Sequence, residues 1–423
     1  MWVDRPEILL LETTTNIRPF RRSLMARPFQ FLARFSLQLL LGVAAFVTAP
    51  AHAEQIITIG FVNPQTGPFA ALGKAARKGM DLALDGAKSN PALKGVSFRV
   101  VERDSAAKVA DAVRYARELE SREKVDVLMG GLSSAECLAL QQFAGEEKLP
   151  YIVASGCWVD DFGDAGRTNR YSFRTTPSNK MRNVAFVSWL TKNVGKRWYV
   201  MYSDTAYGQS GLKAFKETGA EVVGSVGVPF GATDMAAYVS KVDRNADGVY
   251  FVFAGRDATL ALQEALSQGL GKKLRLAGMQ SLIIPEAFPK LPEATEGLAY
   301  IGSYPREASG PLDTPANLAF QKAYGAVAGG EPVGLNAFEA YVATNALLKA
   351  IEKSGFRNRA DSEKLIAAME TLDVPASAQF PGGALSMRKQ DRQAIVPLYI
   401  GTVKGGKESV VHMIPAADVA KIK

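Results

Sequence analysis

The chain has 423 residues, of which 47% are hydrophobic and 22% charged, with 38 Gly and 21 Pro. This composition suits a globular protein of two or three domains and excludes a disordered, collagen-like or disulfide-dense chain. The net charge is +8. The chain contains two His, His52 and His412, and two Cys, Cys137 and Cys157. This small number of His and Cys residues disfavours zinc sites and most histidine-dependent catalysis.

The first residues have the pattern of an export signal. Arginines between residues 18 and 34 precede an apolar run at 36–49, and Ala51-His52-Ala53 supplies the small residues of a cleavage site. The apolar run is shorter than the about 20 residues of a membrane-spanning helix. We therefore predict a signal peptide over residues 1–53, with Met25 as an alternative start, and a mature chain in the periplasm.

Beyond residue 53, short apolar runs alternate with segments of helical periodicity. Strands are predicted at 56–62, 97–102, 125–129, 151–154, 171–174, 198–203, 222–228, 249–253, 274–277 and 297–302. Helices are predicted at 70–87, 106–120, 135–147, 179–193, 209–218, 236–242, 258–268, 336–353 and 362–372. A strand at 395–403 followed by the turn 404–406 is typical of an antiparallel hairpin. The alternation predicts an α/β fold with parallel sheets that helices cover on both faces.

Several function classes find no support in the mature chain. No later apolar run reaches membrane-spanning length, and no basic stripe marks a nucleic-acid surface. Its single His is His412, and neither a G-x-S-x-G elbow nor a P-loop occurs. We therefore expect no enzymatic activity, no cofactor, no metal and no nucleic-acid partner.

Six motifs follow one another along almost the whole mature chain: IGFVNPQTGPFAALG, VDVLMGGLSSAECLAL, PYIVASG, YSFRTTPSN, WYVMYSDTAYGQSGLKAFKETGAEVVG and NAFEAYVATNALLKAI. In this order they resemble the type I periplasmic solute-binding proteins, most closely the leucine/isoleucine/valine-binding proteins that serve ABC importers. The resemblance implies two doubly wound parallel-sheet lobes of the Venus-flytrap type, joined by three hinge crossovers. It also implies a ligand enclosed between the lobes without chemical transformation.

We expect the two lobes to be discontinuous in sequence. The strand–helix alternation starts again near residue 176, and the C-terminal third returns to both units. The N-terminal lobe is predicted to comprise 54–176 with 305–385, and the C-terminal lobe 177–304 with 386–423. Ligands of open α/β sheets lie beyond the carboxyl ends of the strands, where helix N-termini offer free N–H groups. Two such edges facing each other predict a polar cleft suited to an anion.

The sequence Ser133-Ser134-Ala135-Glu136 follows a predicted strand and begins a predicted helix. Ser133 and Glu136 fit a capping box, which by itself is a structural explanation. The resemblance assigns Ser134 to the carboxylate of the ligand. The two roles are compatible, because one serine can cap the helix while the other faces the ligand, so both Ser133 and Ser134 are candidate ligand-binding residues.

The loop after the strand at 151–154 is the second candidate wall of the site. The resemblance places the backbone groups of Ser155 and Gly156 against the ligand. Cys157 stands where amino-acid binders commonly have Thr. Thr176, at the first crossover, completes this set of candidates.

Cys137 and Cys157 are predicted to form a disulfide. Cys137 lies in the first turn of one helix, and Cys157 lies just past the carboxyl end of the next strand. Consecutive parallel strands are often neighbours about 4.8 Å apart, within reach of the roughly 4.4–6.8 Å between the Cα atoms of a disulfide. Export to an oxidising compartment favours the bond. Two separate buried thiols are the alternative.

Three residues of the second lobe bear on the chemistry of the ligand. Tyr207 matches a tyrosine that reaches the cleft in the family, although an aromatic residue at a helix entry explains it nearly as well. Arg256 places a cation near the rim of the cleft, or pairs with Asp257 on the surface. Gln280 falls where amino-acid binders commonly carry a Glu for the ammonium group of the ligand, and a neutral amide cannot supply that charge.

These departures favour a carboxylic acid without an amine, such as an aromatic or short-chain acid. Phe69, Trp158 and Phe338 are candidate apolar walls. We therefore predict a monomeric, periplasmic substrate-binding component of an ABC importer. Its partners are a small amino acid or organic acid and the permease and ATPase complex of the inner membrane. The alternative is a soluble ligand-sensing protein of the same fold that relays to a membrane sensor.

Overall fold

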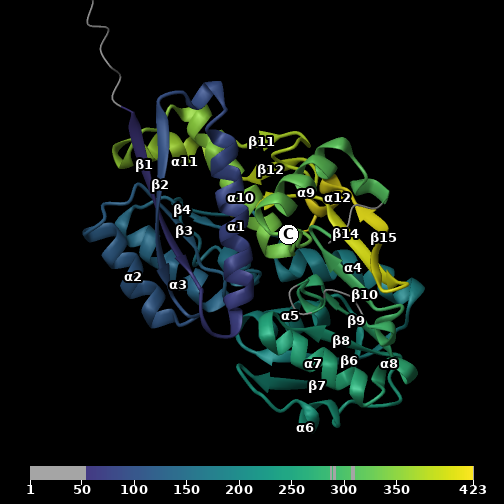
Figure 1. The fold of residues 1–423 in the computed structure, drawn as a ribbon. Helices are drawn as coiled ribbons and strands as arrows, with labels where there is room; N and C mark the ends of the chain where they lie inside the picture. The colour runs from purple at the N-terminus through teal and green to yellow at the C-terminus, as the bar shows by residue number, and fades with distance from the viewer. Residues whose placement is uncertain (1–53, 286–287, 289–291, 306–309, 423) are drawn as a thin grey trace, which may run out of the picture. The chain divides into compact units, whose positions relative to one another are not determined.

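The computed structural model describes residues 54–285, 288, 292–305 and 310–422, which form two α/β lobes, each built on one mostly parallel sheet (Figure 1). The first sheet has the order β11 (Asp373–Val374), β12 (Leu385–Arg388), β13 (Gln393–Ile395), β5 (Ser172–Arg174), β4 (Tyr151–Val153), β3 (Val127–Gly130), β1 (Gln55–Asn63) and β2 (Val96–Asp104). The second sheet has the order β15 (Lys407–Ile414), β14 (Leu398–Lys404), β10 (Ala299–Gly302), β9 (Arg275–Met279), β8 (Gly248–Val252), β6 (Arg197–Asp204) and β7 (Glu221–Pro229).

Both sheets share one topology. The parallel strands run β2-β1-β3-β4-β5 in the first sheet and β7-β6-β8-β9-β10 in the second. In this doubly wound order the direction of winding reverses between the first and third strands, and ligands of such sheets bind at that switch point. The pairs β11–β12, β12–β13, β10–β14 and β14–β15 are antiparallel.

Helices cover both faces of the first sheet. They are α1 (Ala70–Ala87), α2 (Val109–Ser121), α3 (Ser134–Glu147), α10 (Leu335–Ser354) and α11 (Ser362–Glu370), and α9 (Pro315–Val327) packs against α1. Along β3, Val127 and Met129 pack on the face of α1 and α10, which lie side by side (Figure 1), while Leu128 packs on the face of α2 and α3. This alternation is the period of two expected of a strand buried on both faces.

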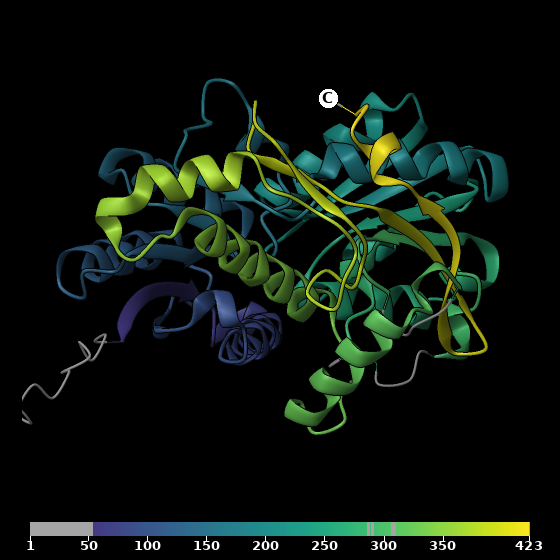
Figure 2. The same ribbon diagram turned by 90° about the horizontal axis from the view of Figure 1, so that it is seen from above.

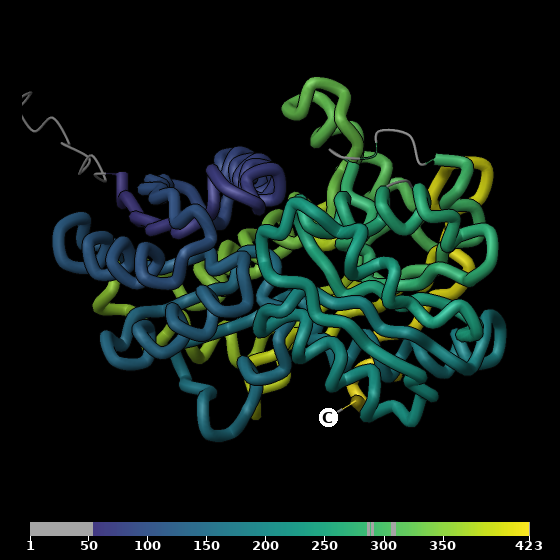
Figure 3. The backbone as a smooth tube through the Cα atoms, turned by 90° about the horizontal axis from the view of Figure 1, so that it is seen from below, coloured from purple at the N-terminus to yellow at the C-terminus, as the bar shows by residue number. Residues whose placement is uncertain are grey.

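The second lobe repeats this construction. Its helices are α4 (Asn179–Asn193), α5 (Ala206–Glu217), α6 (Ala236–Val239), α7 (Gly255–Ser267) and α8 (Leu270–Lys273), and the short α12 (Ala416–Val419) follows β15. Every residue of β8 is buried, as its apolar sequence predicts. Figure 3 shows the teal second lobe beside the purple and blue segments of the first.

The differences from the predicted elements have local causes. The helices α1 and α4 have the predicted bounds. α2 begins three residues later than predicted, because Ala106 and Ala107 have φ values of 49° and 62°, outside the right-handed helical region. α5 begins three residues earlier than predicted, because Thr205 Oγ1 accepts the N–H of Gly208 as an N-cap. α9 has no counterpart among the predicted helices.

The last crossing between the sheets occurs later than predicted. β12 and β13 pair within the first sheet, β13 next to β5, whereas a boundary at residue 385 would assign them to the second lobe. The sequence Val396-Pro397 separates β13 from β14, because proline cannot donate to a strand ladder. From there the yellow strands of Figure 2 enter the second sheet. We propose lobes of residues 54–176 with 305–395 and 177–304 with 398–422.

No helix in the described part of the chain is both long and apolar enough to cross a membrane. The predicted signal peptide at 1–53 and the alternative start at Met25 lie outside the described residues.

Candidate functional site

A cavity of about 110 Å³ lies where strands of the two sheets end. From the first lobe it is lined by Phe69, Ala107, Leu132, Ser133, Ser134, Ala135 and Trp158. From the second lobe it is lined by Ser203, Thr205, Ala206, Tyr207, Phe230 and Ala254. Nearly all of these residues follow the carboxyl end of a strand, which is the edge where the sequence predicted the ligand.

The cavity also lies at the switch point of both sheets. In the first lobe Phe69 follows β1 and Ser134 follows β3. In the second lobe Tyr207 follows β6 and Ala254 follows β8. These are the two positions between which each sheet reverses its winding, so the backbones diverge there and leave room for a ligand.

Two helices of opposite lobes begin at the cavity wall. In α3 the capping box is formed: Ser133 Oγ accepts the Glu136 N–H at 3.2 Å, and Glu136 Oε2 accepts the Ser133 N–H at 3.3 Å. The neighbouring Ser134 hydroxyl has no hydrogen bond to any described residue and lines the cavity. α5 begins beside it, capped by Thr205. The first N–H groups of a helix have no partner within the helix and favour a negative charge, so this wall suits a carboxylate.

Aromatic rings form the remaining walls. The rings of Trp158 and Tyr207 are 5.2 Å apart, and those of Phe69 and Phe230 are also 5.2 Å apart. Each pair joins one residue of the first lobe to one of the second. The hydroxyl of Tyr207 lies 3.2 Å from Ser281 Oγ, and burial raises the pKa of Tyr207 to about 12. The phenol therefore stays neutral, and these walls are apolar.

Among the described residues, none that lines the cavity carries a charge. An α-amino acid brings an ammonium group that needs an anion or several acceptors. A carboxylate, in contrast, needs donors, and the first turns of α3 and α5 supply them. The lining therefore matches a monoanionic acid with an apolar body better than a zwitterion.

A buried ion pair lies directly behind Trp158. Glu339 Oε1, on α10, accepts hydrogen bonds from Trp158 Nε1 at 3.0 Å and from Arg182 Nη2, on α4, at 3.4 Å. Its other oxygen accepts from the Gly156 N–H at 2.9 Å and from Ser155 Oγ at 3.2 Å. The guanidinium carbon of Arg182 is 4.6 Å from the centre of the Trp158 ring. Four donors occupy the carboxylate, so Glu339 is not available to the ammonium group of a ligand.

Each charge of this pair depends on the other. The Arg182 and Glu339 side chains are 1% and 2% exposed. Burial raises the pKa of Glu339, and Arg182 together with the Gly156 and Trp158 donors opposes that rise. Burial likewise lowers the pKa of Arg182, and Glu339 opposes this shift. Loss of either partner would leave the other charged group in surroundings that cannot solvate it.

The predicted disulfide between Cys137 and Cys157 is present, with the Cα atoms 5.8 Å apart. It joins the first turn of α3 to the loop after β4. Gly156 has a φ of 70°, in the left-handed region that favours glycine. A Cβ atom at this position would lie 2.1 Å from the carbonyl oxygen of Leu132, so only glycine allows the two loops to approach this closely. The Cys157 sulfur is bonded and buried, and Cys157 is not among the residues that line the cavity.

Ser155, Gly156, Thr176 and Phe338 do not line this cavity. Ser155 and Gly156 are bonded to Glu339, as described above. The Thr176 hydroxyl donates to the Gly156 carbonyl at 2.7 Å, and the Phe338 ring stacks on Tyr304 at 4.2 Å. Thr176 and Phe338 line a separate cavity of about 20 Å³ at the crossovers. These four residues thus contact Glu339, Tyr304 and one another instead of lining the cavity.

Arg256 and Gln280, two further candidate ligand-binding residues, are not among the residues that line this cavity. Arg256 Nη2 donates to the Gly231 carbonyl at 3.0 Å, and its Nε lies 3.9 Å from Asp257. The Gln280 amide donates to the Tyr304 carbonyl and accepts from the Tyr304 N–H. The polar groups of both side chains are used by nearby backbone segments.

Sequence reasoning missed Phe230, Arg182 and the partners of Glu339. Phe230 had a usable signal, because it follows a predicted strand at its carboxyl end. Arg182 lies inside a predicted helix, 157 residues from Glu339, and no local pattern links the two.

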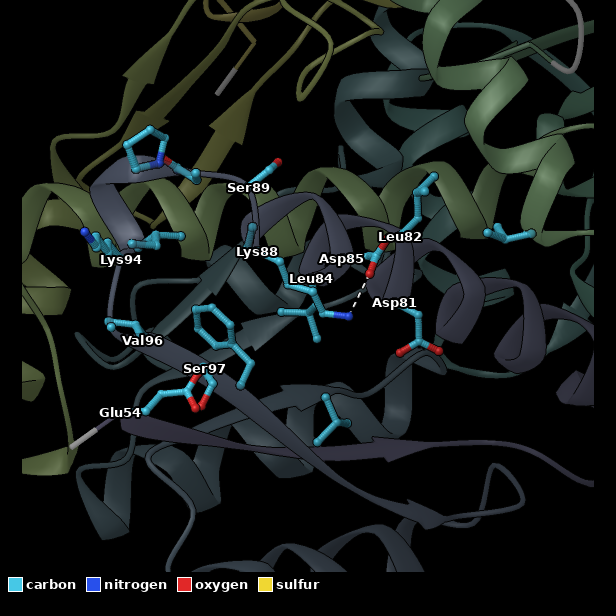
Figure 4. A pocket seen from close by; sticks show the side chains of 18 of the residues that line it. Glu54, Asp81, Leu82, Leu84, Asp85, Lys88, Ser89, Lys94, Val96 and Ser97 are labelled. Carbon is cyan, nitrogen blue, oxygen red and sulfur yellow. Dashed lines mark hydrogen bonds and ion pairs between the residues drawn. The ribbon is translucent and has the colours of Figure 1, made fainter. Parts of the chain in front are cut away.

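A larger hollow of about 910 Å³ lies elsewhere on the first lobe (Figure 4). It is bounded by the last turns of α1, where Lys88 pairs with Asp85, and by the first residues of β2, including Val96. Glu54, just before β1, also lines it. The hollow therefore lies at the amino ends of β1 and β2, away from the strand ends where ligands of this topology bind.

The sequence profile of the family described as periplasmic binding protein matches residues 56–408, and the chain belongs to that family. It is 27% identical over 414 residues to the Leu/Ile/Val-binding protein homolog 8 of Brucella suis biovar 1, covering 93% of this chain and 99% of that protein. Among solved structures, a solute-binding protein of an R. palustris ABC transporter in complex with benzoate is 24% identical, with a TM-score of 0.76 over 85% of this chain and 97% of its own. The leucine-binding protein LivK of Thermotoga maritima is also 24% identical, with a TM-score of 0.72 over 86% and 99%. The relatives are thus solute-binding proteins, and the two-lobe fold is theirs.

Proposed function

We propose that this protein is the periplasmic substrate-binding component of an ABC importer and that its ligand is a small carboxylic acid without an amine. The observation that carries the proposal is the uncharged cavity between the lobes, where the first turns of α3 and α5 and the Ser134 hydroxyl face four aromatic rings. The carboxylate binds at the helix N-termini, and the apolar body lies among the rings. Closure of the lobes around the acid then produces the form that the permease recognises.

Two observations favour an acid over an amino acid. Gln280 is neutral, at a position where members of the family commonly have a carboxylate for the ammonium group of the ligand. Its side-chain amide forms hydrogen bonds with the backbone of Tyr304. Glu339, a buried carboxylate behind Trp158, already accepts four hydrogen bonds. The benzoate complex of the R. palustris relative is consistent with this choice. A cavity of about 110 Å³ is of the order of the about 150 Å³ that holds one benzene ring, so we infer a ligand no larger than one ring.

A ligand panel tests the chemical class. The mature protein is unfolded and refolded to remove bound ligand, then screened by thermal shift against benzoate, 4-hydroxybenzoate, butanoate, leucine, isoleucine and valine. A ligand that binds only the folded state stabilises it by about 2.7 kcal/mol at one hundred times its Kd. We expect the acids to raise the melting temperature and the amino acids to do so much less. Stabilisation by leucine without stabilisation by any acid would contradict the proposal.

The neighbouring serines provide a matched pair of variants. Ser134→Ala is expected to weaken acid binding by about 1.5–3 kcal/mol, the range for a hydrogen bond to a charged group, with little change in stability. Ser133→Ala removes the N-cap and is expected to cost about 1 kcal/mol of stability with a smaller effect on affinity. Calorimetric titration and urea unfolding separate the two. An unchanged affinity in Ser134→Ala would return this residue to a structural role.

Cellular uptake separates the importer from the sensor alternative. Deletion of the gene should abolish high-affinity uptake of the radiolabelled acid, and a plasmid copy should restore it. Unchanged uptake together with a lost transcriptional response to the acid would favour the sensor.

A further inference from the structure

We propose that Phe230 sets the preference of the site for aromatic over saturated acids, and that Asp257 and Arg256 are positioning residues that hold it at the cavity. This inference rests on the proposed binding of a carboxylic acid and names the part of the site that selects its body. It is carried by the turn that bears Phe230, by the contacts that fix this turn, and by the ring opposite it.

Phe230 lies in a tight turn directly after β7. The turn is closed by a hydrogen bond from the Ala232 N–H to the Pro229 carbonyl at 3.1 Å. Its third residue, Gly231, has a φ of 81°, which a type II turn requires at that place and which glycine adopts without strain. The turn presents Phe230 to the cavity and leaves this residue 40% exposed.

The backbone N–H and the backbone carbonyl of Gly231 both form hydrogen bonds with side chains in the first turn of α7. Asp257 Oδ2 accepts the Gly231 N–H at 2.8 Å, and Arg256 Nη2 donates to the Gly231 carbonyl at 3.0 Å. Asp257 is 1% exposed, so its carboxylate is buried against this turn. Because both the N–H and the carbonyl of Gly231 are hydrogen-bonded, the turn has little freedom to move Phe230 away from the cavity. A ring that is fixed in place discriminates better between ligand shapes than a mobile ring does.

The partner ring comes from the other lobe. Phe69 lies 5.2 Å from Phe230, with an angle of 57° between the rings. Phe69 also packs against the start of α7, where a Cβ atom on Gly255 would lie 2.5 Å from its Cδ1. Phe69, Phe230 and Gly255 therefore form one contact across the lobes at the cavity. An aromatic ligand adjoining this pair gains edge-to-face or offset contacts that a saturated ring cannot make.

Two acids of the same charge and similar size provide the probe, benzoate and cyclohexanecarboxylate. The measured quantity is the ratio of their Kd values in calorimetric titrations of the mature protein. Phe230→Leu keeps an apolar side chain at the cavity but removes the ring. We expect this variant to reduce the preference for benzoate about fivefold, within the range for an aromatic pair.

The positioning role of Asp257 has its own readout. Asp257→Ala should reduce the benzoate preference about as much as Phe230→Leu, and it should have no further effect in the Phe230→Leu background. Asp257→Asn keeps an acceptor for the Gly231 N–H and should retain the wild-type ratio. Asp247→Ala is the matched control, because Asp247 also accepts backbone N–H groups, from Lys196 at 2.7 Å and Arg197 at 2.9 Å, but lies at the amino end of β6, away from the cavity.

The outcomes distinguish this inference from the function on which it rests. If the wild-type protein binds both acids and Phe230→Leu leaves their ratio unchanged, the selectivity role of Phe230 is overturned while the proposed function stands. If Asp247→Ala shifts the ratio as much as Asp257→Ala does, the positioning role is overturned. If the wild-type protein binds neither acid, the proposed function fails and this inference fails with it.

Discussion

Replacing Arg182 by Met tests whether the buried ion pair behind Trp158 supports the site. Methionine preserves much of the apolar stem against the Trp158 ring but removes the charge that faces Glu339. At the observed 3.4 Å and an effective dielectric constant of about 20, Coulomb's law gives about 5 kcal/mol of lost attraction. Glu339 can relieve part of this cost by taking up a proton. We therefore expect Arg182→Met to lower the free energy of unfolding by about 3–5 kcal/mol, as found when one partner of a buried pair is removed.

The assay is equilibrium unfolding in urea at pH 7, followed by tryptophan fluorescence. The variant Lys349→Met is the matched control, because Lys349 pairs with Glu352 at 3.0 Å on the same helix, α10, with both side chains about one third exposed. Exposed pairs of this kind contribute about 0.2–1 kcal/mol. The control should therefore be nearly as stable as the wild type.

A second substitution separates charge from packing. In Arg182→Met/Glu339→Gln no buried charge is left without a partner, and the Gln oxygen can still accept from Gly156 and Ser155. We expect this double variant to be more stable than Arg182→Met alone. A loss below about 1 kcal/mol in Arg182→Met, or a double variant less stable than the single one, would refute the reasoning.

Two further predictions follow from the same region. Burial raises the pKa of Glu339, and removal of Arg182 takes away the largest opposing effect. A carboxyl group whose folded-state pKa is raised stabilises the fold below its unfolded pKa of about 4.3 and loses that contribution as the pH rises through the folded pKa. The loss caused by Arg182→Met should therefore be larger at pH 8 than at pH 5, and a loss that shrinks with rising pH would contradict this sign. Replacing Cys137 and Cys157 by Ala opens a loop with a sequence separation of 20 and should cost about 3 kcal/mol by the chain-entropy model. Reduction of the wild-type protein should produce the same decrease in urea unfolding, and alkylation of the unreduced, unfolded protein should add no label.

The amino-acid sequence by itself determined the architecture. Apolar runs separated by segments of helical period predicted the strands and helices, because burial of one face or of both imposes those periods on the chain. The resemblance of six motifs, in their order, to the type I periplasmic solute-binding proteins then implied two doubly wound lobes. The disulfide was also within reach of sequence reasoning, since consecutive parallel strands are often neighbours and their ends bring Cys137 close to Cys157.

The tertiary structure decided which polar group meets which. Arg256 and Gln280 were expected at the ligand, yet each bonds to a backbone segment that folding brings beside it, at Gly231 and Tyr304. Arg182 on α4 and Glu339 on α10 meet although they are 157 residues apart in the sequence. Periodicity is a short-range property that a segment carries alone, whereas the partner of a buried charge depends on how segments far apart in the sequence pack together. The architecture could therefore be derived from the sequence, but the contacts that shape the cavity could not.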